Sequence, residues 1–319
     1  MKNIAEILDG VKTMGIGGHV RPDGDCVGSC MALYLYVKTY WPEIQVDVYL
    51  DHPKPVFGHI DCMDEVKMEL DGEKEYDLFV TCDVSAKDRL AIAAPYFDSA
   101  KKTACIDHHV SNPGFAQINH IRGEVSSACE VLYSLLDPEK INCTIAKPIY
   151  TGMVHDTGVF QDSCTSKKTM DIAGSLMEMG IDYPKIIDET FYTKTFSQNK
   201  ILGQALIKSE LYLDGDVIFT WISLDEMRKY DVLPKHLDGI VNQLRITKDI
   251  KIAVFLYENE DGTYKGSLRV NGDYDVSAIA SIFGGGGHVK AAGFTIDGPV
   301  DIARDRIIGA IKENIRGNG

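Results

Sequence analysis

The sequence lacks the features of membrane-spanning and secreted proteins. No apolar stretch of the 319-residue chain is long enough to cross a bilayer. Residues 1–15 follow an amphipathic helix pattern with acidic residues inside it, without the apolar run and cleavage signal of a secretory leader. The eight cysteines form no CxxC pair, and Cys82, Cys105 and Cys129 sit in apolar runs. We therefore expect a cytoplasmic protein with reduced, buried thiols and no contact with a membrane.

The chain also lacks a basic stripe. Its 47 acidic residues outnumber its 33 lysines and arginines, which gives a formal net charge of −14. A protein that binds long nucleic acid normally has a basic face that displaces many counterions from the phosphate backbone. The charge therefore argues against long nucleic acid as a partner. An anionic substrate should be small, and bound cations and a few placed residues should hold it.

The chain does contain enough apolar sequence for two domains, because 319 residues exceed the usual size of one hydrophobic core. In its first part, apolar runs alternate with helix-period segments. This α/β pattern is typical of a mainly parallel sheet with helices on both faces. The predicted strands are 14–18, 46–50, 78–82 and 103–106, and the predicted helices are 26–38, 128–135, 146–155 and 168–179.

A long helix at about 187–209 is expected to connect this domain to a smaller α+β domain. Its sequence is DETFYTKTFSQNKILGQALIKS, and strand-like segments such as IKIAVFLYEN and YKGSLRVNG follow it. There is no low-complexity linker, so a few hinge positions should set the interdomain geometry. The predicted division is a first domain at 1–188, a connecting helix at 189–208 and a second domain at 209–319.

Residues that can bind metals follow three of the predicted strands. In an open parallel sheet the carboxyl ends of the strands meet at one crevice, where ligands collect. The residues are His19, Asp23 and Asp25 after the first strand, Asp83 after the third, Asp107, His108 and His109 after the fourth, and Asp156 in the later segment IYTGMVHDTGVF.

Each of these residues has a structural alternative to metal binding. A strand-end aspartate such as Asp23 or Asp25 is usually a turn or helix cap, and a lone histidine is more often an ordinary surface or core residue. Convergence favours a metal site, because two carboxylates about 4 Å apart repel by roughly 4 kcal/mol at an effective dielectric near 20. Bound cations would offset that repulsion.

The donor types indicate which cations fit. Imidazole and carboxylate donors without thiolate favour Mn²⁺ and Mg²⁺ over Zn²⁺, Co²⁺ or Fe²⁺, and imidazole shifts the preference toward Mn²⁺. The donors are too many for one ion. Two ions about 3.5 to 4 Å apart suit hydrolysis of a phosphate ester, since both polarise the phosphoryl oxygens and acidify a bridging water.

Two groups of motifs resemble known domains and together cover nearly the whole chain. One resembles the motif set of the DHH phosphoesterase superfamily and consists of HVRPDGD (19–25), Gly28-Ser29, Asp83, Asp107-His108-His109 and Asp156. The other resembles the DHHA1 domain and consists of GGGGHVKAAG (284–293), SLR (267–269) and DVS (275–277). The two-domain layout is similar to that of the bacterial oligoribonuclease and pAp phosphatase (nanoRNase-like) subfamily.

The resemblance implies a role for each motif residue in the first domain. The ligands of one ion would be His19, Asp23 and Asp83, and those of the other would be Asp25, Asp83, His108 and Asp156. His109 would contact the scissile phosphate or assist the leaving group, with its side chain pointing away from the metal side. Asp107 would accept a hydrogen bond from an imidazole and fix its tautomer.

The glycine run of the second domain has two interpretations. Four consecutive glycines are often a flexible loop. Between a helix-period segment and an apolar strand, however, the backbone of Gly285, Gly286 and Gly287 could approach a nucleotide and offer N–H groups to a phosphate. By resemblance, Arg269 and His288 would hold the far end of the substrate. Val270 departs from the family pattern, which often has a small hydroxyl residue there.

The leading hypothesis is a hydrolase that releases mononucleotides from oligonucleotides of a few residues and also dephosphorylates 3′-phosphoadenosine 5′-phosphate (pAp). A RecJ-like exonuclease shares the motifs, but the acidic charge argues against it. The glycine run disfavours the pyrophosphatase and polyphosphatase branches. A small-nucleotide sensor without hydrolysis remains an alternative. The sequence leaves the oligomeric state open, a homodimer included.

Overall fold

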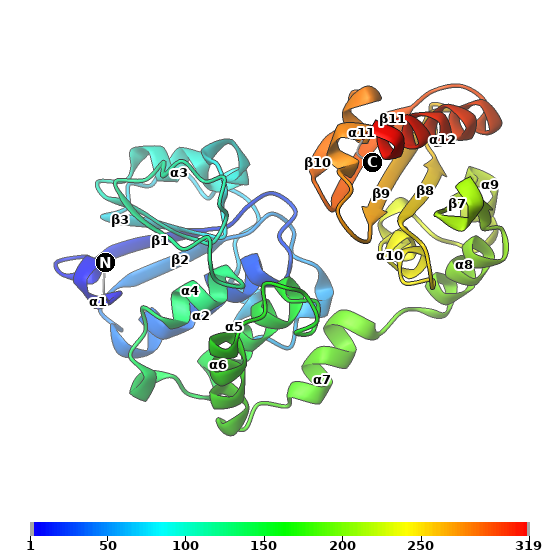
Figure 1. The fold of residues 1–319 in the computed structure, drawn as a ribbon. Helices are drawn as coiled ribbons and strands as arrows, with labels where there is room; N and C mark the ends of the chain where they lie inside the picture. Colours follow the sequence, from blue (N-terminus) through cyan, green and yellow to red (C-terminus); the bar gives the residue numbers. More distant parts are fainter. Residues whose placement is uncertain (1–2, 318–319) are drawn as a thin grey trace. The chain divides into compact units, whose positions relative to one another are not determined.

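The computed structural model describes residues 3–317, which form two compact units with a boundary between Thr193 and Lys194 (Figure 1). Both units contain a sheet with helices on its faces, so the predicted α/β class is confirmed. Within residues 3–317, no helix combines the length and apolarity needed to cross a membrane.

The sheet of the first unit has five parallel strands in the order β2-β1-β3-β4-β5. The bounds are β1 (Thr13–Gly17), β2 (Gln45–Tyr49), β3 (Leu78–Cys82), β4 (Thr103–Asp107) and β5 (Ile118–Ile121). The four predicted strands are confirmed to within one residue. The sequence does not predict β5, because this edge strand has four residues, two of which are Asn119 and His120.

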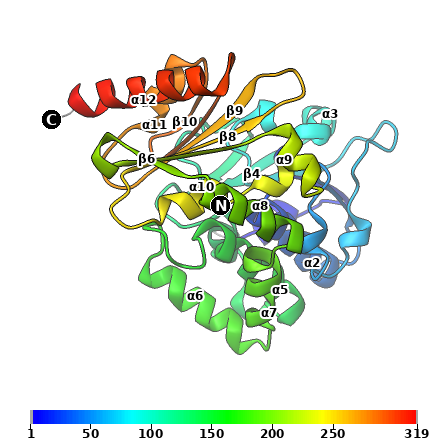
Figure 2. The same ribbon diagram turned by 90° about the vertical axis from the view of Figure 1, so that its right-hand side faces the viewer.

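Helices cover both faces of this sheet. Met14 and Ile16 of β1 point into a core with α2, α4 and α5, whereas Phe79 of β3 points to the opposite face, where α3 packs. Figure 2 shows α6 and α7 beside α5. The helices are α1 (Ala5–Leu8), α2 (Gly24–Tyr40), α3 (Ala94–Ser99), α4 (Ala128–Tyr133), α5 (Cys143–Asp156), α6 (Lys167–Glu178) and α7 (Tyr183–Ile187). Short 3-10 turns lie at Pro55–Phe57, Met63–Glu65, Lys87–Arg89, Ala91–Ala93 and Pro138–Lys140.

Two glycines let α2 and α5 approach closely. A Cβ at Gly28 of α2 would lie 2.4 Å from the carbonyl oxygen of Pro148, and a Cβ at Gly152 of α5 would lie 2.8 Å from Oδ1 of Asp25. Neither position therefore accepts a side chain without movement of the neighbouring helix. The contact matters for the site described below, because Asp25 is in α2 and Asp156 ends α5.

Two helix predictions are wrong. In the described part of the N-terminal amphipathic segment, residues 3–15, the only helix is α1, since Gly10 adopts a φ of +73° and β1 starts at Thr13. The predicted connecting helix is interrupted: a π-helix (Asp188–Tyr192) follows α7, and α8 (Phe196–Ile207) begins anew. Thr195 starts α8 with a capping box, exchanging hydrogen bonds with Gln198. A T-x-x-Q pattern is a helix-start signal, so the break was encoded in the segment.

The second unit contains a six-stranded sheet in the order β10-β11-β9-β8-β7-β6. Neighbouring strands are antiparallel except for the parallel pair β7–β8. The bounds are β6 (Glu210–Tyr212), β7 (Val217–Ile222), β8 (Ile252–Glu258), β9 (Tyr264–Val270), β10 (Gly286–His288) and β11 (Ala291–Ile296).

Helices lie on both faces of this second sheet as well (Figure 1). One core packs α11 and α12 against the sheet, and a separate core packs α8, α9 and α10 against the other face. The helices are α9 (Leu224–Lys229), α10 (Ile240–Arg245), α11 (Val276–Ile282) and α12 (Val300–Gly317), with 3-10 turns at Leu213–Gly215 and Pro234–Leu237.

Candidate metal centre

The carboxyl ends of β1, β3 and β4 lie next to one another in the first unit, because β3 pairs with both β1 and β4. Each of these strands runs directly into residues with imidazole or carboxylate groups. The ends of α2 and α5 bring two further carboxylates to the same edge. The structure thus brings together the six predicted metal-binding residues: His19, Asp23, Asp25, Asp83, His108 and Asp156.

Asp83 lies at the middle of this group. Its Oδ2 is 3.4 Å from Nε2 of His19, and its Oδ1 is 3.6 Å from Nε2 of His108. The residue is 2% exposed, and Oδ1 has no hydrogen-bond partner among the described residues. A φ of +58° turns the backbone sharply after β3, while the Asp83 N–H still donates to the carbonyl of Ile106. The two oxygens therefore face two different imidazoles.

His19 presents a defined nitrogen to this centre. Its Nδ1 lies 2.8 Å from the carbonyl oxygen of Val20. A carbonyl can only accept, so Nδ1 carries a proton and Nε2 is the nitrogen with the free lone pair in the neutral ring. Nε2 lies 3.8 Å from Oδ1 of Asp23. The same oxygen caps α2 by accepting from the N–H groups of Asp25 and Cys26, so the capping interpretation of Asp23 also holds.

The second part of the group combines His108 with two carboxylates. Its Nε2 lies 3.0 Å from Oδ2 of Asp156 and 3.9 Å from Oδ2 of Asp25. Ligand atoms of all three residues lie within 4.8 Å of one another. The chain thus offers a cluster of one imidazole and two carboxylates, and the imidazole lies 3.6 Å from Oδ1 of Asp83.

The first turn of α4 anchors Asp25, a contact that the sequence does not reveal. Oδ2 accepts from the Ala128 N–H at 2.6 Å and Oδ1 from the Cys129 N–H at 2.9 Å. Ser127 caps α4 by accepting from the N–H of Glu130, but the S-x-x-E pattern at residues 127–130 does not complete a capping box. Glu130 turns its carboxylate to Ser126 and Thr169 instead of the cap N–H.

His109 lies on the same side as its neighbour, which corrects the orientation expected for it. Its Nδ1 is 3.6 Å from Oδ1 of Asp83, and its ring centroid is 4.8 Å from that of His108. Neighbouring side chains point to opposite faces only within a strand, and β4 ends at Asp107, before both histidines. Nδ1 of His109 also donates to Oδ1 of Asp107 at 2.8 Å, and the side chain of Asn112 donates to Oδ2 at 2.6 Å. The sequence carries no signal for Asn112.

The cluster fits divalent cations. The pKa of Asp25 is raised mainly by burial and secondly by the charge of Asp156. The pKa of Asp83 is also raised mainly by burial, and secondly by the charge of Asp25. Burial alone would lower the pKa of His108, but Asp156 and Asp25 raise it. Protons thus supply part of the balancing charge, and metal ions would displace them. Imidazole and carboxylate donors suit Mn²⁺.

The predicted substrate-binding residues of the second unit lie on three neighbouring strands. Arg269 of β9 is opposite Ala291 of β11, which is opposite His288 of β10. Directly opposite residues project to the same face, so Arg269 and His288 share a face, two strand spacings or roughly 10 Å apart. Nε of Arg269 donates to Oδ1 of Asn242 at 3.1 Å.

The glycine run is not a flexible loop, because Gly286–His288 forms the edge strand β10. A Cβ at Gly285 would lie 2.2 Å from the carbonyl oxygen of Gly293, and one at Gly287 would lie 2.5 Å from that of Ala291. Packing within the unit therefore explains these two glycines. No atom lies within 4 Å of a Cβ built at Gly286, so its missing side chain leaves open space beside the strand.

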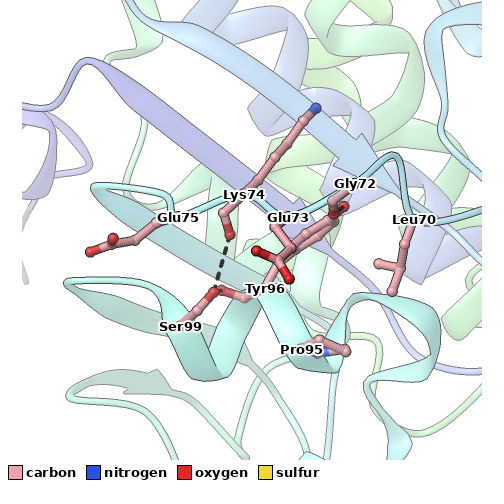
Figure 3. Close-up of a pocket in the computed structure, with 8 residues that line it drawn as sticks. All are labelled: Leu70, Gly72, Glu73, Lys74, Glu75, Pro95, Tyr96 and Ser99. Carbon is pink, nitrogen blue, oxygen red and sulfur yellow. Dashed lines mark hydrogen bonds between the residues drawn. The ribbon is translucent and has the colours of Figure 1, made fainter.

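A separate cavity of the first unit is unsuited to an anionic substrate. It has a volume of about 520 Å³ and lies between residues 70–75 and α3 (Figure 3). Glu73 and Glu75 contribute carboxylates to its lining. Of the eight lining residues, Lys74 is the one cation, and its amino group is paired with Asp47 and Asp71. The cavity contains none of the predicted metal-binding residues.

The chain matches two family models. Residues 13–153 match the DHH family N-terminal domain, and residues 214–317 match the DHHA1 domain. Together the two matches span about three quarters of the chain.

Named relatives match the chain over most of its length. The bifunctional oligoribonuclease and PAP phosphatase NrnA of Thermus thermophilus is 27% identical over 319 residues, covering 99% of this chain and 94% of its own length. The protein of the same name from Bacillus subtilis is 28% identical over 285 residues, 87% of each chain. The crystal structure of an exopolyphosphatase-related protein from Bacteroides fragilis matches with a TM-score of 0.88 at 24% identity, covering 97% of this chain and 94% of that one. This likeness shows a shared fold.

Proposed function

Because the chain belongs to the DHH phosphoesterase superfamily, with a DHH N-terminal domain followed by a DHHA1 domain, we propose that it is a Mn²⁺-dependent hydrolase of very short oligonucleotides. It releases mononucleotides from substrates such as the linear dinucleotides pApA and pGpG. It also removes the 3′-phosphate of pAp. The two similar proteins named NrnA, which match over most of both chains, support both activities.

The observation that carries the proposal is the buried carboxylate of Asp83. Leaving a polar oxygen buried without a partner costs free energy, yet Oδ1 of Asp83 has no partner among the described residues. Its Oδ2 lies 3.4 Å from Nε2 of His19, and its Oδ1 lies 3.6 Å from Nε2 of His108. Asp83 would therefore contribute one oxygen to a cation held with His19 and the other to a cation held with His108.

The proposed ligands follow this division. His19, Asp23 and Asp83 would hold one Mn²⁺ ion, and Asp25, Asp83, His108 and Asp156 would hold the other. When bound, such an ion pair acidifies a water molecule and polarises the phosphoryl oxygens. The chain keeps the ligands in place through hydrogen bonds: Val20 fixes the His19 ring, and the first turn of α4 fixes Asp25.

His109 is the proposed proton donor to the leaving oxygen. Its Nδ1 is held by Asp107, so Nε2 is left to face the substrate. Asp107 has its pKa lowered despite its burial, because His109 and Asn112 donate hydrogen bonds to it. As a general acid, His109 would deliver a proton to the leaving oxygen through Nε2 while Asp107 holds the ring through Nδ1.

The second unit is proposed to bind the far end of the substrate. Arg269 and His288 share a face of its sheet, and the space beside Gly286 leaves backbone atoms of β10 accessible. A guanidinium fork suits a phosphate group. The net charge of −14 favours a substrate with few phosphates, because long strands would be repelled.

The test is hydrolysis of pApA, pGpG and pAp with Mn²⁺ by wild type and by Asp83→Asn. The matched control is Asp98→Asn, which removes a half-exposed carboxylate paired with Lys87 in the same unit. Hydrolysis by wild type and the control, with loss in Asp83→Asn, supports the proposal. Equal turnover in all three contradicts it. Preference for a long single strand would indicate a RecJ-like exonuclease, and binding with intact nucleotide recovered would indicate a sensor.

A further inference from the structure

A sulfur atom lies beside the proposed metal ligands. Cys26 is in the first turn of α2, directly after Asp25, and it is fully buried. Its Sγ accepts a hydrogen bond from the backbone N–H of His19 at 3.2 Å. Ligand atoms of His19, Cys26 and Asp83 all lie within 4.8 Å of one another. The sequence predicts a donor set without sulfur, and the position of this thiol changes that set.

The local backbone leaves room for the sulfur. A Cβ at Gly18 would lie 2.3 Å from Sγ of Cys26 and 3.3 Å from Sγ of Cys30. The sulfur of Cys26 therefore packs directly against the backbone that leads from β1 to His19. The carboxylate of Asp83 is the third buried donor. Asp83 is 2% exposed, and its Oδ2 lies 3.4 Å from Nε2 of His19, so this carboxylate, the imidazole and the sulfur form one buried group that a cation can occupy.

We propose that Cys26 is an additional ligand for thiophilic divalent cations such as Zn²⁺ and Cd²⁺, together with His19 and Asp83. This inference rests on the proposed function, because His19 and Asp83 are also the proposed Mn²⁺ ligands. Thiolates select soft cations, whereas Mn²⁺ is satisfied by oxygen and imidazole. On binding, the S–H bond breaks, a bond forms between sulfur and the cation, and the proton passes to the solvent.

The consequence is inhibition by metal exchange. A thiophilic ion held by Cys26, His19 and Asp83 occupies residues that Mn²⁺ requires, so Zn²⁺ or Cd²⁺ lowers the rate of hydrolysis at fixed Mn²⁺. Added thiol competes for the soft cation and restores the rate. The thiol of Cys26 thereby determines how strongly thiophilic cations compete with Mn²⁺ for His19 and Asp83.

Cd²⁺ is the probe, because a bond between cadmium and a thiolate produces an ultraviolet charge-transfer band. One equivalent of Cd²⁺ is added to wild type, Cys26→Ser and Cys30→Ala. Cys30 is the matched control: it is fully buried one turn along α2 but belongs to none of the metal-ligand groups formed by residues 3–317. The band is expected in wild type and Cys30→Ala. Cys26→Ser should lose it and bind Cd²⁺ about 10- to 100-fold more weakly. Equal bands in wild type and Cys26→Ser overturn the proposal.

A competition experiment on wild type keeps the proposal testable even if Cys26→Ser fails to fold. Saturating Mn²⁺ should suppress the Cd²⁺ band, because the two cations share His19 and Asp83; a band that persists in full overturns the proposal. Hydrolysis of pApA with Mn²⁺ is measured on the same sample before Cd²⁺ is added. Normal hydrolysis without a Cd²⁺ band refutes the role of Cys26 alone, whereas absent hydrolysis refutes the proposed function.

Discussion

The close contact between α2 and α5 can be tested with Gly28→Ala. The added Cβ would lie 2.4 Å from the carbonyl oxygen of Pro148 and 3.1 Å from Sγ of Cys129. An ordinary carbon–oxygen contact is about 3.4 Å, so α5 has to move away from α2 by about 1 Å. That movement separates Asp25 on α2 from Asp156 at the end of α5, whose ligand atoms now lie within 4.8 Å.

The expected effect on function is larger than the effect on stability. Metal ligands must be placed to within roughly 0.2 Å, and a misplacement of about 1 Å can lower a rate by about 100-fold. Overpacking lowers the free energy of unfolding by about 1–3 kcal/mol, and the higher helix propensity of alanine offsets about 1 kcal/mol of that loss. We expect about 100-fold lower turnover of pApA, weaker Mn²⁺ binding and a Tm lower by up to about 8 °C.

Gly174→Ala is the matched control, because Gly174 lies within α6 and no atom is within 4 Å of a Cβ built there. It should keep wild-type turnover and stabilise the protein by about 0.5–1 kcal/mol. Turnover is measured against Mn²⁺ concentration, and unfolding is followed by calorimetry. If Gly28→Ala matched Gly174→Ala in turnover and Mn²⁺ affinity, the contact between α2 and α5 would not position the ligands.

Three further outcomes are expected. The raised pKa values of His108, Asp25 and Asp83 mean that these groups hold protons which Mn²⁺ must displace, so Mn²⁺ affinity should rise with pH until they have ionised. Calorimetry in buffers of different ionisation enthalpy should detect the released protons, and binding without release would contradict the assigned protonation. Asn112→Ala removes the side chain that donates a hydrogen bond to Oδ2 of Asp107, so kcat should fall about 10- to 100-fold with little change in KM. An unchanged kcat would show that Asn112 does not help to position His109. Arg269→Lys loses the planar fork and should raise KM for pApA about tenfold with kcat retained, whereas steady-state kinetics identical to wild type would exclude Arg269 from substrate binding.

Much of the first unit is predictable because its central strands are buried. The strands 78–82 and 103–107 are runs of buried residues, and such runs stand out from the helix-period segments between them. Once the strands are parallel, their carboxyl ends share one edge. That rule is sufficient to bring His19, Asp83 and His108 together without knowledge of the loops.

The features that escape prediction depend on long-range contacts or on local breaks. The hydrogen bonds from α4 to Asp25 join residues more than 100 positions apart. The interruption before α8 depends on Thr195 and Gln198, a cap hidden within a helix-like segment. The proximity of Cys26 to His19 depends on the missing side chain of Gly18, and neither composition nor periodicity reveals such a contact.

The two-metal site is tested most directly by anomalous diffraction from crystals grown with Mn²⁺. Two manganese peaks are expected about 3.5 to 4 Å apart, with the carboxylate of Asp83 between them. One should lie next to Nε2 of His19 and the other next to Nε2 of His108. Peaks remote from Asp83, or none at saturating Mn²⁺, would contradict the two-metal site.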